Sequence, residues 1–148
     1  MHTYASALAL SGITVPAHLE ADAEVPVLCG AQGQGDLLVV PVDPPRGVRW
    51  LPVPVRGIQV IRGEATGNTH WLHMGFESPG VRFAPDAAGV RVGYLRVPEG
   101  GSALLIHTDE HGANGIGLGT YAVHRKRAHV PSVGMTPRVE PSTQLVED

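Results

Sequence analysis

The amino-acid sequence predicts an all-β domain, a small barrel or sandwich of six to eight strands, with a short helix near the N-terminus. Two observations favour this class. The 19 Gly and 13 Pro residues are unfavourable in helix interiors, and they separate short apolar runs, as turn residues do. A chain of 148 residues suits one domain with a buried core. We expect an N-terminal arm with the helix over 1–34, the β domain over 35–129 and a C-terminal arm over 130–148.

Seven segments of the β domain have the apolar or alternating pattern of strands. They are residues 36–42, 57–61, 69–74, 81–84, 90–97, 102–106 and 120–123. The turn at 98–101, Pro-Glu-Gly-Gly, predicts a hairpin between the strands on either side of it. Residues 43–54 contain four prolines, which lack a backbone donor, so we expect a turn or an edge segment there and no central strand.

The N-terminal arm contains two short helical candidates. Residues 5–10 are small and apolar but too few for a stable isolated helix, so they must pack on another element or fray. Residues 16–23 begin with a proline and carry acidic residues, which suits the first turn of a helix. Residues 16–23 could therefore form the short helix, and residues 5–10 could form it if they pack on another element.

Residues 104–129 hold four of the eight histidines, and we expect the rest of the domain to be organised around them. The apolar run 104–106 leads into the polar residues 107–111, His-Thr-Asp-Glu-His. Residues 112–119 are rich in glycine and are expected to form a hairpin tip, after which 120–123 return as a second strand.

Composition and charge exclude several classes of function. The formal net charge of −3 provides no global field that would attract nucleic acid or an anionic membrane. Cys29 is the only cysteine, so neither an intrachain disulfide nor a thiolate metal site can form. No apolar run approaches the roughly 18 residues that cross a bilayer, and the N-terminus lacks the basic start of a secretory signal. We expect a soluble cytoplasmic protein, or one within a phage or host assembly.

Three groups of residues resemble a pattern in small uncharacterised β-rich proteins of phage and bacterial genomes. They are Gln34-Gly35-Asp36, the run GEATGNTH at 63–70, and Asp109-Glu110-His111 followed by Gly119-Thr120-Tyr121. The pattern of that group has a QGD strand start, a GE-x-TGH-x-H turn, an EH element and a GTY strand. The resemblance spans much of the chain and implies a phage-related origin.

This chain departs from that pattern at several positions. Asn68 stands where the first turn histidine would be, and His107 lies four residues before His111 instead of three. Ala128 and His129 replace a terminal acid and tyrosine. If the pattern marks a metal or catalytic site in that group of proteins, the present chain has lost part of the site.

Histidine and carboxylate side chains are the metal ligands that remain when cysteine is absent. The candidates for a divalent ion, Zn, Fe, Mn or Ni, are His70, His107, Glu110 and His111, provided that the turns near Gly67 and Gly112 lie at the same end of the domain.

Alternation along the strand 69–74 divides its two histidines. It places His70 on one face with Leu72 and Met74, and His73 on the opposite face with Trp71. The order Gly67, His70, His73 and Glu77 is similar to the cupin pattern, which implies a metal cluster inside a cupin-like roll. The two histidines are three residues apart here, whereas the cupin pattern has them two apart.

Arg125, Lys126 and Arg127 could contact phosphate groups. Affinity for nucleic acid requires several neutralised phosphates, and three consecutive charges are few. We therefore favour a strand end with one charged face, and we do not expect nucleic acid as a partner.

The sequence leaves two functions open. The preferred one is a non-enzymatic, self-assembling structural or accessory module, phage-related as the resemblance implies, which forms a homo-oligomer through its arms. The anchors expected in the C-terminal arm are Val130, Val133, Met135, Val139 and Leu145, which could lie in a groove or pair with a sheet edge. The alternative is a cupin-like metal-binding protein or metalloenzyme. No cofactor other than the metal ion is expected.

Overall fold

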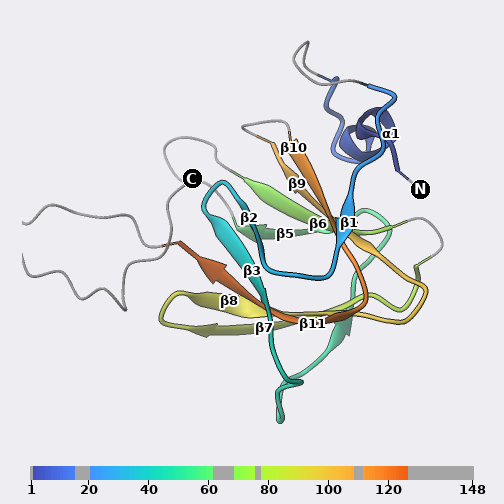
Figure 1. Cartoon of the computed structure of the whole chain (residues 1–148). Coiled ribbons are helices and arrows are strands. Elements are labelled where there is room, and N and C mark those ends of the chain that lie inside the picture. The colour runs from blue at the N-terminus through green and yellow to red at the C-terminus, as the bar shows by residue number, and fades with distance from the viewer. Residues whose placement is uncertain (1, 16–20, 62–68, 76–77, 109–111, 127–148) are drawn as a thin grey trace, which may run out of the picture.

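Two β-sheets lie face to face in the computed structural model of the chain, which describes residues 2–15, 21–61, 69–75, 78–108 and 112–126 (Figure 1). The elements are α1 (Tyr4–Ala9), β1 (Val27–Leu28), β2 (Gln32–Gln34), β3 (Leu37–Pro41), β4 (Leu51–Pro52), β5 (Ile58–Ile61), β6 (His70–Met74), β7 (Arg82–Ala88), β8 (Arg91–Val97), β9 (Ala103–His107), β10 (Gly112–Ile116) and β11 (Gly119–Arg125). The predicted all-β class is confirmed. The barrel alternative is wrong, because no hydrogen-bonded strand pair joins the two sheets within the described residues.

The five-stranded sheet has the order β1-β10-β9-β6-β5, and the six-stranded sheet has the order β2-β3-β11-β8-β7-β4. Neighbouring strands are antiparallel, except that β1 runs parallel to β10. Strand β9 is central in the first sheet, and β11 lies between β3 and β8 in the second. Both strands come largely from the histidine-rich stretch at 104–129, so this stretch contributes to both layers.

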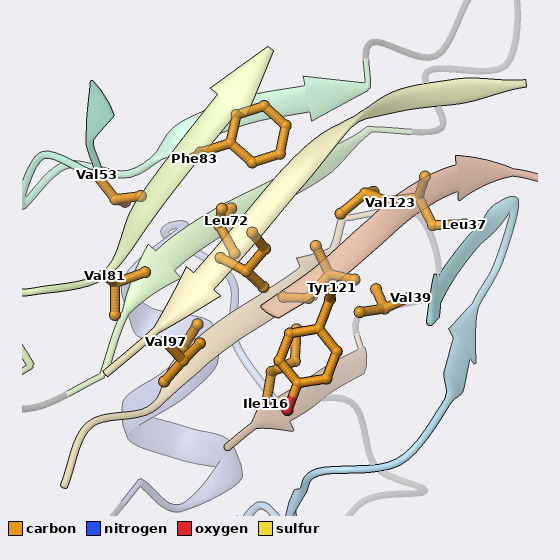
Figure 2. Close-up of a cluster of buried hydrophobic side chains, with 13 residues drawn as sticks. Leu37, Val39, Val53, Leu72, Val81, Phe83, Val97, Ile116, Tyr121 and Val123 are labelled. Carbon is orange, nitrogen blue, oxygen red and sulfur yellow. The ribbon is translucent and has the colours of Figure 1, made fainter. Parts of the chain in front are cut away.

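The main hydrophobic core lies between the sheets (Figure 2). Strand β3 contributes Leu37 and Val39, β6 contributes Leu72, and β11 contributes Tyr121 and Val123. The two residues from β3 are two positions apart, as are the two from β11, so each strand presents one face to the core. The alternation of apolar residues in the sequence reflects this one-sided burial.

Helix α1 covers the outer face of the five-stranded sheet (Figure 1). Its Ala7 and Leu8 pack against Leu104 and Ile106 of β9, whereas Leu105 belongs to the core between the sheets. Every residue of β9 is consequently buried. Burial on both faces explains why residues 104–106 form an uninterrupted apolar run.

The predicted short N-terminal helix is α1, which corresponds to the candidate at 5–10. Of residues 16–23, only 21–23 are described, and they form a turn and a bend. In α1 the Thr3 hydroxyl accepts a hydrogen bond from the Ser6 N–H at 3.1 Å, and the Ser6 hydroxyl accepts one from the Thr3 N–H at 2.9 Å. This capping box and the contact with β9 stabilise a helix that would be too short in isolation. No helix in the described part of the chain is long and apolar enough to cross a membrane.

All seven predicted strands are present, as β3, β5, β6, β7, β8, β9 and β11. The predicted count of six to eight was too low, because the described residues form eleven strands. The glycine-rich stretch 112–119 was wrongly predicted as a hairpin tip, since its first five residues form β10 beside β9. A Cβ atom on Gly115 would lie 2.5 Å from the carbonyl oxygen of Pro26, so glycine permits the close approach of β1.

The predicted hairpin between residues 90–97 and 102–106 is also wrong. Strand β8 pairs with β7 and β11 in one sheet, and β9 pairs with β6 and β10 in the other. The turn at 98–101 therefore carries the chain from one layer to the other. Its residues suit a tight turn in either topology, so local turn chemistry could not reveal which sheet the next strand joins.

Substitution of Leu105 by alanine tests the double burial of β9. Leu105 is 3% exposed, so Leu105→Ala should lower the free energy of unfolding by about 2–5 kcal/mol through lost apolar contact and a residual cavity. Leu118→Ala is the matched control, because that side chain is 53% exposed and its truncation should cost no more than about 0.5 kcal/mol. Denaturant unfolding measures both. Equal losses in the two variants would contradict the placement of β9.

Candidate functional site

Two histidines that the sequence singled out lie side by side between the sheets. His70 begins β6 and His107 ends β9, and the two are register partners across the antiparallel pair. Both side chains are buried, and their rings are stacked with centroids 4.2 Å apart and planes 7° from parallel. His70 and His107 follow the alternation of Leu72 and Leu105, so they face the six-stranded sheet.

Gln34, from β2 of the opposite sheet, reaches across to this pair. Its side-chain oxygen lies 3.1 Å from Nδ1 of His70. Its side-chain nitrogen donates to the carbonyl oxygen of Leu105 at 2.7 Å and to the side-chain oxygen of Asn114 at 2.8 Å. Because both amide hydrogens of Gln34 are used in this way, its oxygen faces His70 and accepts a hydrogen bond from Nδ1–H of that ring.

Asn114 continues the same network on β10. Its side-chain nitrogen donates to the side-chain oxygen of Gln32 at 3.1 Å and to the carbonyl oxygen of Gly33 at 3.2 Å. Gln32 in turn donates to the carbonyl oxygen of Gly115 at 3.0 Å. These amides connect β2 of one sheet with β9 and β10 of the other. We refer to Gln32, Gln34, His70, His107 and Asn114 as the polar cluster.

The turn between β2 and β3 fits closely against the polar cluster. Gly35 has φ +52°, and a Cβ atom there would lie 2.7 Å from Cε1 of His107. Glycine is therefore required both by the backbone conformation and by contact with the imidazole. The structure thus brings together Gln34-Gly35 and His70, which belong to two segments of the sequence pattern, and His107, which was named with His70 as a candidate metal ligand.

His70 is neutral in the folded protein. Burial is the main cause that lowers its pKa to about 3, and His107 and Lys126 lower it further. With the proton on Nδ1, the lone pair of His70 lies on Nε2, which is buried and has no hydrogen-bond partner in the described part of the chain. A neutral imidazole held in this tautomer is the form that binds metals.

The stacked geometry does not allow both rings to bind one ion as they lie. A metal ion bonds in the plane of an imidazole ring, about 2 Å from the nitrogen. The ring planes of His70 and His107 are nearly parallel and are stacked one over the other, so they do not meet within bonding distance of both nitrogens. No group of three or more His, Cys, Asp or Glu side chains suited to a metal occurs within the described residues. Glu110 and His111, the other two candidate ligands, lie outside them.

His73 lies on the opposite face of β6, as predicted. Its Nε2 is 3.4 Å from the hydroxyl of Ser11, which follows α1, and its ring is stacked at 6.3 Å from that of Trp71. Gly57 has φ +82° and approaches so closely that a Cβ atom would lie 2.5 Å from the His73 ring. Burial lowers the pKa of His73 and, to the same effect, the pKa of His124 on β11. His73 is buried and His124 is partly buried, and the two lie on different strands.

The basic residues at 125–127 do not share one environment. Arg125 is exposed at the end of β11. The backbone N–H of Lys126 donates to the carbonyl oxygen of Asp36 at 2.7 Å, and its ammonium group lies beside Gly33 in the β2–β3 hairpin. Arg127 lies outside the described residues. Whether the three contact phosphate stays a prediction.

An apolar cleft of about 410 Å³ opens between the two sheets at one lateral edge. It lies between the edge strands β5 and β4, and β7 and β8 form its floor. The side chains that line it include Leu51, Ile58, Val60, Phe83, Pro85 and Val92. Sequence reasoning missed this cleft because each of these residues belongs to an ordinary strand or proline-rich segment. Only the pairing of distant strands brings them together.

The fold and these sites together define a two-layer β-sandwich whose sheets are joined by a buried polar cluster at one place and separated by an open apolar cleft at another. A family model for a domain of unknown function, DUF8820, matches residues 33–126, and the chain belongs to this family. The match runs from β2 to the end of β11. No curated protein and no solved structure matches the chain.

Acid should destabilise the protein through His70. The pKa of His70 is about 3 in the folded state, and 6.5 is the ordinary value that applies to the unfolded chain. The unfolded chain therefore binds the proton more readily. The stability from neutral His70 is present above pH 6.5 and is lost as the pH falls from 6.5 toward 3, by about 1.4 kcal/mol per pH unit. In His70→Gln, the unfolding free energy from urea titrations should fall less steeply between about pH 6.5 and pH 5 than in the unchanged protein. Identical slopes would show that His70 is not held neutral.

Proposed function

We propose that the protein is a non-enzymatic module that self-associates, with its C-terminal arm, residues 130–148, as the contact between copies. The anchors named above, Val130, Val133, Met135, Val139 and Leu145, belong to this arm and lie outside the described residues. The phage-related origin is likewise a proposal, supported by the QGD, EH and GTY resemblance alone.

The open lateral edge of the sandwich is the observation that carries this proposal. An apolar cleft of about 410 Å³ lies between β5 and β4, which are the edge strands of the two sheets among the described residues. The cleft exposes apolar side chains of the layer between the sheets. Apolar side chains are also exposed at the far edge of the five-stranded sheet, where Val27 and Leu28 of β1 are each 51% exposed. Sheet edges with apolar margins are sites where another chain can add.

The polar cluster supports the same proposal because its geometry suits a structural role. Gln34 and Asn114 use their amide groups to join strands of the two sheets. His70 and His107 are stacked and buried, which places them out of contact with solvent. Removing either amide would leave buried partners unsatisfied, so the cluster fixes how the two sheets are aligned.

The mass of the protein in solution tests self-association. Full-length protein at tens of micromolar should scatter light as a homo-oligomer, and deletion of residues 130–148 should lower the mass to that of the monomer. The circular dichroism spectrum of the deletion variant should keep its β form, because all eleven described strands precede residue 130. A full-length protein that is monomeric under these conditions contradicts the proposal.

A metal-binding function is the second candidate, and one observation favours it. Nε2 of His70 carries a lone pair, is buried and has no hydrogen-bond partner within the described residues. A metal site would require His70 or His107 to turn out of the stack, with Glu110 and His111 supplying further ligands.

Metal analysis separates this candidate from the first. Under the metal hypothesis, purified protein that has not met a chelator should hold about one equivalent of Zn, Fe, Mn or Ni per chain. His111→Ala should remove most of it, since one of three or four ligands is lost, whereas His73→Ala, on the opposite face of β6, should not. Background metal content in the unchanged protein would end this candidate.

A further inference from the structure

The two sheets differ in width at the open edge of the sandwich. Among the described strands, one sheet ends at β5 after five strands and the other at β4 after six, with the apolar cleft between these ends. Ile58 and Val60 line the cleft from β5, and Leu51 and Phe83 line it from β4 and β7. A sixth strand beside β5 would lie over the cleft and make the two sheets equal in width.

The C-terminal arm contains a segment with the pattern of such a strand. From 131 to 142 the residues alternate without exception. The odd positions are apolar (Pro131, Val133, Met135, Pro137, Val139 and Pro141), and the even positions are polar or glycine (Ser132, Gly134, Thr136, Arg138, Glu140 and Ser142). Successive side chains of a strand point to opposite faces, so this segment would have one apolar and one polar face when extended.

The prolines add a second requirement. All three of them, at 131, 137 and 141, occupy odd positions. Backbone N–H groups of successive residues in a strand point to opposite edges, so the three missing donors fall on a single edge. The other edge keeps every donor and acceptor. A segment of this kind can pair along one side only, as a terminal strand does.

We infer that residues 131–142 of one copy add beside β5 of a second copy as a sixth strand, with their odd-numbered side chains over the apolar cleft. Strand β5 pairs with β6 alone among the described strands, so its outer edge is the place for strand addition. This inference rests on the proposed function and names the segment and the surface through which the copies meet.

The partner is taken as a second copy because this inference rests on the proposed self-association. Strand β11 ends at Arg125, two strand positions from β7, and the added strand would lie one layer away. Two strand spacings and the distance between sheets amount to roughly 14 Å in a straight line. The connection from Arg125 to Pro131 comprises residues 126–130 and spans roughly 20 Å when fully extended. Its length permits exchange between copies, and the mixing of cysteine variants distinguishes exchange from docking within one copy.

Disulfide trapping in the full-length chain tests the inference. All variants carry Cys29→Ser, which removes the native cysteine. Protein with Val60→Cys is mixed with protein that carries Val133→Cys, Met135→Cys or Val139→Cys. One protein of each mixture carries a mass tag, so that a mixed dimer can be told from a dimer of identical chains. Mild oxidation should trap a mixed dimer for at least one of these pairs, because side chains on the same face of neighbouring strands lie within disulfide distance. Thr136→Cys is the matched control from the polar face, and Leu118→Cys, paired with the same arm variants, is the control for an exposed site elsewhere.

The outcomes separate the inference from the proposed function. If the protein is oligomeric but Val60→Cys is trapped no more often than Leu118→Cys, the arm docks elsewhere and this inference is overturned while self-association stands. If the full-length protein is monomeric by light scattering, both fall. A disulfide formed inside single chains that carry Val60→Cys together with an arm cysteine, and absent from the mixtures, overturns exchange between copies.

Proline substitution tests which edge of the arm pairs. Gly134→Pro removes an N–H from the edge proposed to pair with β5, so the mass in light scattering should fall toward the monomer. Gly134→Ala keeps that N–H and alters none of the apolar anchors, so the oligomer should persist. Equal effects of the two variants, or a larger effect of Gly134→Ala, would overturn pairing through this edge.

Discussion

Burial of β9 on both faces is the constraint on which the rest of the structure depends. Leu104 and Ile106 face helix α1, and Leu105 and His107 face the opposite sheet, so no residue of this strand meets solvent. An apolar strand of this kind needs cover on two sides. Helix α1 supplies one cover, although it is too short to be stable alone, and the six-stranded sheet supplies the other. The same burial draws His107 into the interior at the end of the strand.

Burying the polar atoms of an imidazole costs free energy unless partners offset it. The pair is held by the stack of the two rings, the hydrogen bond from His70 to Gln34 and the bare backbone of Gly35, while Nε2 of His70 has no hydrogen-bond partner among the described residues. Gln34 and Asn114 then link the two layers through their amides. One end of the sandwich is therefore closed by polar contacts. The lateral edge at β5 and β4 lacks such contacts among the described residues and exposes apolar side chains instead. This asymmetry is the basis of the self-association that we propose.

Sequence patterns were sufficient to predict the strands whose residues alternate between apolar and polar or are apolar throughout. They also correctly placed His70 and His73 on opposite faces of β6. They failed where tertiary contacts decide. Residues 112–116 contain two glycines and were interpreted as part of a turn, yet they form a strand that pairs with β9. Gly115 in this strand permits the close approach of β1 on the other side. The turn at 98–101 gave no sign that it crosses between layers. Of the four proposed metal ligands, His70 and His107 come together because they are register partners on β6 and β9. The sequence does not determine this register. Gln34 was visible in the QGD pattern, but its contact with His70 depends on the packing of two sheets, and so does the apolar cleft.

Hydrogen exchange at β5 in the full-length protein tests most directly whether another copy completes the five-stranded sheet. The peptide that contains Ile58–Ile61 would be followed by mass spectrometry over a dilution series that crosses from oligomer to monomer. Strand addition predicts that its amide hydrogens exchange slowly at high protein concentration and faster on dilution, while β9, which is covered within one copy, exchanges slowly throughout. Exchange at β5 that does not change with concentration, in a protein whose mass does change, would contradict the account.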